Sequence, residues 1–303
     1  MQSPGKIFNK IIKAIIRKTL KGTIRVGKQA YIRRPLLPNL MVNSLQHEEF
    51  LDDIYIAALK GKEGAIIDVG VNTGQTLLKM LSFDKDRTYY GFEPQSTAAS
   101  CVESFLIENQ INNFKILPIA LSDSNTCIPL NIRGTGIFSM ASSVASMVEG
   151  FRPDDFYDYK KYIYAARGDE VIDSLEIPSI ALIKIDVEGA ELEVIKGLEM
   201  KIGEHRPFIL FEVLHHYLVV TNQELDKETM EFRDSRTREL EAILRGKSYQ
   251  IYQIIGNEQA IKIQKIEPKV VNDLESTDYI AVPEEKEAVF CQHLESTRKI
   301  INA

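Results

Sequence analysis

Two acidic residues in apolar runs are the first sign of chemistry in this chain. Residues 65–69 form a short apolar run that contains Asp68, and Gly70 and Gly74 follow four positions apart before a helical pattern begins. A second apolar run ends in Glu93. A buried strand, a tight glycine loop, a helix and a parallel strand with a terminal carboxylate are typical of a site for the nucleoside part of a cofactor.

The glycine loop differs from the loop of dinucleotide sites. A fingerprint for NAD reads G-x-G-x-x-G, and its middle glycine lets the backbone approach a pyrophosphate, whereas residues 70–74 read Gly-Val-Asn-Thr-Gly. Asp68 and Glu93 would repel a diphosphate and attract a cationic, phosphate-free nucleoside such as S-adenosylmethionine. The sequence favours that methyl donor. A nicotinamide-dependent oxidoreductase is the alternative, and a tight turn without a ligand is the purely structural explanation.

Three more acids follow an apolar strand predicted at 180–185. Asp186 and Glu188 come at the end of that strand, and Glu191 follows Gly189, which turns the chain into a helix. Ligands of open α/β sheets bind outside the carboxyl ends of the strands. We therefore expect Asp186 and Glu188 to face the site, and we expect Glu191 to interact with the helix dipole instead.

These motifs resemble those of FkbM-type methyltransferases over about residues 45–283. The matching segments are Asp-Val-Gly-Val-Asn-Thr-Gly at 68–74, Phe-Glu-Pro at 92–94, Ala-Leu-Ser-Asp at 120–123, Ser142-Ser143, Asp-Ser-Leu at 173–175, Lys-Ile-Asp-Val-Glu-Gly-Ala-Glu at 184–191, Phe-Glu-Val at 211–213 and Tyr-Ile-Ala-Val at 279–282. The resemblance implies a class I methyltransferase fold, which is Rossmann-like α/β: a seven-stranded, mostly parallel sheet with its last strand antiparallel and helices on both faces. It also implies S-adenosylmethionine as the donor and O-methylation, often of sugars or glycosylated natural products.

The resemblance also implies roles for individual residues. The residues that it places around the cofactor are Asp68, Gly70, Asn72, Gly74, Glu93, Ser122, Asp123 and Asp186. The first four would surround the methionine portion, and Glu93 would hydrogen-bond the ribose hydroxyls. Ser122 and Asp123 would lie by the adenine. Asp186 would close the pocket near the transferring methyl group.

Methyl transfer to an alcohol oxygen is helped by a base that takes the hydroxyl proton. Histidine titrates near neutrality, so we predict His215 as a catalytic residue, together with Asp186 and Glu212. The alternative is that His215 and His216 lie in a polar loop without a catalytic role. We predict no metal site. Asp186, Glu188 and Glu212 carry oxygen atoms that suit Mg²⁺, but their spacing does not require a cation.

Strand-like and helix-like runs alternate along the chain, which predicts βαβ units and a parallel sheet. Strands are predicted at 65–69, 88–92, 114–120, 180–185 and 207–213, with closing strands at 249–255 and 279–282, and helices at 46–60 and 225–245. Residues 127–170 interrupt this alternation and contain an aromatic cluster from Phe151 to Tyr164. We predict that this segment is an acceptor-binding lid over the carboxyl edge, whose rings either stack on a sugar or pack the lid onto the core.

Charge divides the chain into two parts. Residues 1–47 contain ten basic residues and no acid, so the rest holds 27 basic and 43 acidic residues, a net charge of −16 within a total of −6. Such a body excludes broad nucleic-acid binding. We therefore predict a basic amphipathic extension at 1–38 before a methyltransferase domain at 39–303. In a helix over 6–20, isoleucines lie on one face and basic residues on the other, so residues 6–21 are predicted to bind an anionic membrane surface. The alternative is that this helix docks on protein.

The remaining composition indicates where the protein works. Three scattered cysteines favour a reducing compartment, and no apolar run approaches the roughly 20 residues needed to span a bilayer. We expect a cytoplasmic protein, peripheral at the inner face of the membrane, that methylates a glycan or glycolipid acceptor. A methyltransferase-like body that serves as a non-catalytic membrane adaptor is the non-enzymatic alternative.

Overall fold

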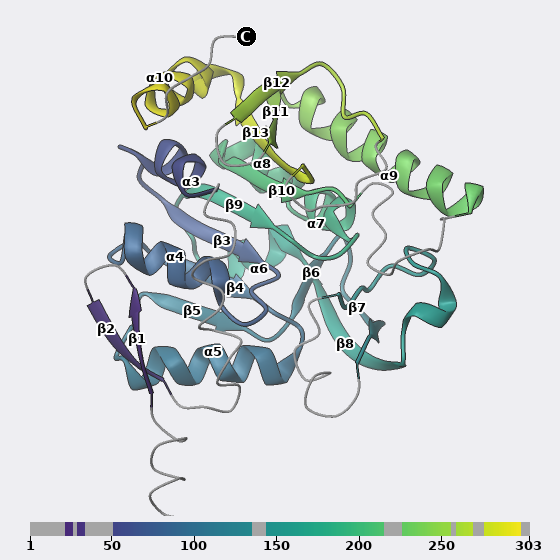
Figure 1. Ribbon diagram of the computed structural model, residues 1–303, viewed down its shortest axis with the longest axis horizontal. Helices are drawn as coiled ribbons and strands as arrows, with labels where there is room; N and C mark the ends of the chain where they lie inside the picture. Colours follow the sequence, from purple (N-terminus) through teal and green to yellow (C-terminus); the bar gives the residue numbers. More distant parts are fainter. Residues whose placement is uncertain are drawn as a thin grey trace, which may run out of the picture.

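The computed structural model describes residues 22–26, 29–33, 51–134, 144–214, 226–255, 259–268 and 276–297. The helix predicted at 6–20 and the candidate base His215 lie outside these residues. Within them the chain forms a large mixed sheet with helices on both faces and a smaller sheet beside it (Figure 1). None of the helices that the structure describes is long and apolar enough to cross a membrane.

The main sheet has the architecture predicted for a class I methyltransferase. In spatial order its eight strands, within the described residues, are β12 (Gln259–Ile263), β11 (Tyr249–Ile255), β13 (Asp278–Pro283), β10 (Phe208–Glu212), β9 (Ile180–Ile185), β3 (Ala65–Val69), β4 (Tyr89–Phe92) and β5 (Phe114–Leu117). The five strands from β10 to β5 run parallel to one another. β13 is antiparallel to both of its neighbours. The prediction of a mostly parallel sheet whose last strand in the chain is antiparallel is therefore confirmed.

The strand number was predicted as seven, and β12 makes it eight. β12 pairs with β11 as an antiparallel hairpin at the edge of the sheet. Its sequence, Gln-Ala-Ile-Lys-Ile, is short and half polar, so it lacks the continuous apolar run that identifies an inner strand. β5 also ends earlier than predicted, because the chain turns after Leu117, where the Ile119 N–H donates to the Leu117 carbonyl.

Helices cover both faces because the inner strands are apolar on both sides. All six residues of β9 are buried. The helices on one face are α3 (Asp52–Leu59), α4 (Gln75–Phe83), α5 (Ser96–Glu108) and α10 (Glu287–Thr297). Those on the other face are α6 (Gly168–Ser174), α7 (Glu191–Gly197), α8 (Glu199–His205) and α9 (Lys227–Gly246). α9 matches the helix predicted at 225–245, and the Asp226 carboxylate caps it by accepting the Thr229 N–H at 2.8 Å.

Two strands of a second, three-stranded sheet lie in the predicted lid. Its strands in order are β6 (Ala120–Ser122), β8 (Tyr159–Arg167) and β7 (Thr126–Ile132), and the 3-10 turn η4 (Asp154–Phe156) precedes β8. β8 is parallel to β6 and antiparallel to β7. The sheet has a small apolar core of its own, which includes Leu130, Ile132 and Ile163. In Figure 1 it lies on the side toward which the parallel strands point.

The aromatic residues of this segment have two kinds of surroundings. Phe151 is buried, and Phe156 and Tyr157 are half-buried. On β8, Tyr162 is 79% exposed, and Tyr164 is exposed on the same face of the strand. Phe151 therefore packs the segment onto the domain, while the two tyrosines present rings to solvent.

A β-hairpin lies within the segment predicted as the N-terminal extension. It consists of β1 (Gly22–Val26) and β2 (Gln29–Arg33), which pair antiparallel. The hairpin lies beside α4 and α5 of the domain (Figure 1). The folded part of the described chain therefore includes residues that precede the predicted domain start at 39.

Candidate active site

The loop between β3 and α4 is held against the end of β9. Gly70 has a φ of +92°, and a Cβ at this position would lie 1.8 Å from the carbonyl oxygen of Asp186. The Asp186 N–H donates to the carbonyl of Val69 at 3.0 Å. Gly74, with a φ of +90°, precedes the first residue of α4. Only glycine allows this backbone geometry and this closeness at position 70, so the loop and the acidic segment after β9 form one unit.

Glu93 joins the same loop to the end of β4. Its Oε2 accepts the N–H of Asn72 at 2.9 Å, and its Oε1 accepts the N–H of Gln95 at 2.7 Å. The side chain is buried. Burial raises the pKa of Glu93 to about 7, against the lowering effect of these two N–H bonds and of the Lys161 charge. A carboxylate oxygen accepts more than one hydrogen bond, so Glu93 is fixed in place and still able to accept from a ligand hydroxyl.

Asp68 lies under the loop and is 1% exposed. Its Oδ2 accepts the hydroxyl of Tyr89, whose ring stacks on Phe114 at 4.8 Å between centroids. The ring of Tyr89 has room because Gly91 has no side chain: a Cβ there would lie 3.0 Å from Tyr89 Cε1. The structure thus places Asp68 in the interior beside the glycine loop, bonded to a tyrosine of the neighbouring strand.

Three acidic residues meet at the ends of β9 and β10. Asp186, Glu188 and Glu212 each place a carboxylate oxygen within 4.8 Å of the others, and we call them the acidic trio. Burial, and then the charge of Asp186, raises the pKa of Glu212 well above its ordinary value. Burial raises the pKa of Glu188 to about 7, which the charge of Arg152 opposes. Glu188 can therefore gain or lose a proton near neutral pH.

Each member of the trio has a polar partner. Lys184 Nζ lies 2.8 Å from Asp186 Oδ2, Arg152 Nη2 lies 2.5 Å from Glu188 Oε2, and the Thr277 hydroxyl donates to Glu212 Oε1 at 3.0 Å. The oxygen set would suit a divalent cation such as Mg²⁺. Two of its three carboxylates are paired with cationic side chains.

The glycine loop, Glu93 and the acidic trio all lie within one family match. A family model described as the methyltransferase FkbM domain matches residues 68–251, which is more than half of the chain. The chain belongs to the FkbM methyltransferase family. The family predicted from the motifs is thereby confirmed. A search of curated proteins gave no match.

Solved structures that resemble the chain do so at low sequence identity. Methyltransferase FkbM from Methylobacillus flagellatus KT is 16% identical, with 72% of this chain and 43% of that one aligned at a TM-score of 0.44. An O-methyltransferase from Bacillus cereus in complex with SAH is 12% identical, with 82% and 88% aligned at 0.42. An SAH-bound methyltransferase from Podospora anserina is 8% identical, with 92% and 97% aligned at 0.42. The alignment thus spans less than half of the M. flagellatus protein.

Other residues predicted for the FkbM site lie away from the trio or outside the described chain. The carbonyl oxygen of Ser122 packs against Gly197, at the opposite end of α7 from Glu191. Asp123 is exposed. His215 lies outside the described residues. Glu191 itself is buried, and its Oε1 accepts the N–H groups of Val187 and Gly189 at 3.3 and 3.2 Å.

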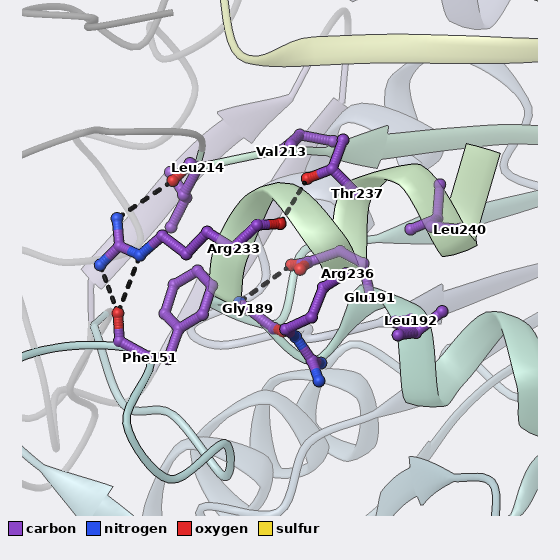
Figure 2. Close-up of a pocket in the computed structure, with 10 residues that line it drawn as sticks. All are labelled: Phe151, Gly189, Glu191, Leu192, Val213, Leu214, Arg233, Arg236, Thr237 and Leu240. Atoms are coloured by element: carbon purple, nitrogen blue, oxygen red, sulfur yellow. Dashed lines mark hydrogen bonds between the residues drawn. The ribbon is translucent and has the colours of Figure 1, made fainter. Parts of the chain in front are cut away.

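Two buried arginines of the FkbM domain were not predicted as site residues. Arg152 reaches Glu188 from the inserted segment. Arg233 of α9 donates to the carbonyl oxygens of Phe151 and Leu214 and lies over the Phe151 ring, 4.3 Å from its centroid (Figure 2). For Arg152, the signal in the sequence was that it directly follows Phe151 within the inserted segment. Spacing alone does not distinguish a buried arginine from an exposed one.

A small pocket lies beside these residues, between α7, α9 and the end of β10 (Figure 2). Gly189, Glu191, Arg233 and Leu240 are among the residues that line it. Its volume of about 20 Å³ has room for about one water molecule. It is therefore too small to be the site of a nucleoside cofactor.

Proposed function

We propose that this FkbM methyltransferase is an S-adenosylmethionine-dependent O-methyltransferase that acts on a sugar hydroxyl of a glycan or glycoconjugate. The observation that carries the proposal is the double position of Asp186. Its backbone contacts Gly70 of the glycine loop, and its side chain belongs to the acidic trio. A donor held by the loop and an acceptor hydroxyl held at the trio would therefore meet at one residue, which is the proximity that an in-line transfer needs.

The residues around the loop fit a sulfonium nucleoside. The donor supplies the methyl group on a positively charged sulfur, and the acidic edge of the sheet favours positive charge. Glu93, fixed by two backbone N–H groups, would accept the ribose hydroxyls. The absence of side chains at Gly70 and Gly74 would let the ligand approach the backbone of the loop.

Within the trio, Asp186 is the best placed base. Its side chain is 30% exposed, against 17% for Glu188, so an acceptor hydroxyl reaches it more readily. Glu212 and His215 are the other candidates. We expect Asp186→Asn to lower the turnover number by about 10²–10⁴-fold, the usual contribution of a general base. The assignment fails if His215→Ala has that effect on turnover and Asp186→Asn does not.

A sugar acceptor is supported by the exposed tyrosines of β8. Tyr162 and Tyr164 share one solvent-facing side of the strand, and aromatic rings of this kind bind the apolar face of a sugar. The membrane part of the proposal rests on the basic residues 6–21. A glycolipid acceptor at the inner face of the membrane would be consistent with both the exposed tyrosines of β8 and the basic residues 6–21.

The direct test is transfer of a labelled methyl group. The purified protein is incubated with [methyl-¹⁴C]-S-adenosylmethionine and fractionated cell extract, and the labelled product is identified. We expect label in a glycan or glycolipid fraction as a base-stable methyl ether. Label confined to protein or nucleic acid would contradict the proposed acceptor, and the absence of label in every fraction would contradict the activity.

A further inference from the structure

Two guanidinium groups share one aromatic ring beside the acidic trio. Arg133, directly after β7, has its Cζ 4.2 Å from the centroid of Phe156, and Arg152 has its Cζ 4.8 Å from the same centroid. Both contacts are within the range of cation–π attraction. The ring of Phe156 is half-buried, so the two cations lie close to the surface but are covered.

Both guanidinium groups hold buried N–H donors that lack a partner. Arg152 is 4% exposed, and its Nη2 binds Glu188, but its Nε has no acceptor among the described residues. The Nη1 of Arg133 is also buried without an acceptor in the described chain. Unsatisfied buried donors are rare in folded proteins, and those that occur usually mark the place of a water, an ion or a ligand group.

A third guanidinium lies near Arg152. Arg233 approaches from α9, and burial, together with the charge of Arg152, lowers the pKa of Arg233 to about 10. Glu188 is the carboxylate that pairs with Arg152. Asp158 lies nearby, and its Oδ2 accepts the N–H of Gly134 at 2.6 Å. A buried cation is costly unless an anion compensates its charge.

We propose that Arg133 and Arg152 bind an oxyanion, a carboxylate or a phosphate, carried by the acceptor. A guanidinium presents parallel N–H groups that match the oxygens of either anion. Because Arg152 also holds Glu188 of the trio, an anionic group bound there would place a neighbouring hydroxyl of the same molecule at Asp186. An acceptor with such an anionic group would be an acidic or phosphorylated glycan. That the bound molecule is the methyl acceptor rests on the proposed function, whereas the anion site does not.

The test compares three monosaccharide probes on the full-length protein saturated with S-adenosylhomocysteine (SAH). The probes are glucuronic acid, glucose 1-phosphate and neutral glucose, and saturation-transfer NMR titrations give their affinities. We expect both anionic probes to bind about tenfold or more tightly than glucose, and to weaken as salt is raised. The ratio between the two anionic probes tells which anion the site prefers.

Variants connect the binding to the two arginines. Arg133→Met removes one guanidinium and is expected to weaken the anionic probes about tenfold. Arg152→Lys keeps a cation beside Glu188, so this variant is expected to fold. It removes the parallel N–H donors of the guanidinium. Arg238→Met, on the exposed face of α9, is the matched control and should leave the affinities unchanged.

The outcomes separate this inference from the proposed function. Equal binding of glucose and the anionic probes, or unchanged affinities in Arg133→Met, would overturn the anion site. Binding of the anions only without SAH would mean that the arginines hold the carboxylate of the donor, which would overturn the assignment to the acceptor. Failure of SAH to bind the same sample would contradict the proposed function, while anion binding would still be read from the NMR titration.

Discussion

Gly70 has no room for a side chain, and this makes it the most sensitive residue of the cofactor loop. We expect Gly70→Ala to lower the free energy of unfolding by about 3 kcal/mol or more, because the methyl group would meet the Asp186 carbonyl at 1.8 Å and φ is +92°. Urea denaturation measures the loss. Gly61→Ala is the control: φ is +67° but nothing lies within 4 Å of its Cβ, so we expect about 1 kcal/mol. Equal losses would contradict the role of the close contact.

Residue types and spacing predicted part of this site and could not predict the rest. The motifs after β3, β4 and β9 indicated which carboxylates lie at the sheet edge, because parallel strands end at a common edge. The bond from Tyr89 to Asp68 depends on the space above Gly91, which is a property of packing between strands. The partnership of Arg152 with Glu188 joins residues 36 positions apart, and no local pattern contains it.

Among the elements, α9 holds the inserted segment through the side chain of Arg233, beside the apolar packing of Phe232. We expect Arg233→Met to destabilise this docking by about 3 kcal/mol, because the buried guanidinium donates to the carbonyls of Phe151 and Leu214. Hydrogen exchange of residues 144–153 should accelerate accordingly. The control Arg238→Met, at an exposed position of the same helix, should change the free energy of this docking by less than about 0.5 kcal/mol. Acceleration that is equal in both variants, or absent in both, would contradict this account.

Elements with strong periodicity were predicted closely, and those at edges were not. β3, β9 and β11 have the predicted bounds because runs rich in isoleucine and other strand-forming residues identify them. β12 and the β1–β2 hairpin were missed, since short two-stranded pairings at the surface depend on their neighbours more than on their own sequence. The segment at 127–170 was predicted as a lid because it interrupts the alternation, and one of its strands, β8, pairs with β6, which lies outside that range.

The basic segment before the hairpin allows a clean test of membrane binding. We expect deletion of residues 1–21 to lower partitioning onto vesicles with 30% phosphatidylglycerol by tenfold or more, since each of the six basic residues at 6–21 contributes about 1 kcal/mol near an anionic surface. The deletion stops at Lys21 so that the hairpin beside α4 and α5 is kept. Co-sedimentation at low and high salt is the measurement. Partitioning that is insensitive to both salt and deletion would contradict an electrostatic anchor.

At the scale of the whole molecule, buried carboxyl groups make stability depend on pH. The carboxyl groups whose pKa is raised at this edge are those of Glu93, Glu188, Glu191 and Glu212. Three of them have a pKa of about 7 against an ordinary 4.5. Between these values the folded protein holds protons that the unfolded chain has lost, so the free energy of unfolding falls as pH rises. His205 opposes this trend, because burial lowers its pKa.

Glu191→Gln tests this pH dependence at one residue. The amide oxygen can still accept the N–H groups of Val187 and Gly189 that now bind Oε1, while the titrating charge is removed. We expect unfolding free energies, measured by urea denaturation from pH 5 to 8, to decline less steeply in the variant than in the natural protein. A natural protein whose stability rises across this range would contradict the buried, proton-holding carboxyls.

The central claim is that the glycine loop and Glu93 bind a sulfonium nucleoside and not a dinucleotide. Isothermal titration calorimetry of the full-length protein with SAH and with NAD decides between them most directly. We expect saturable binding of SAH, weakened by Gly70→Ala, and no measurable heat with NAD. Tight binding of NAD without binding of SAH would contradict the claim.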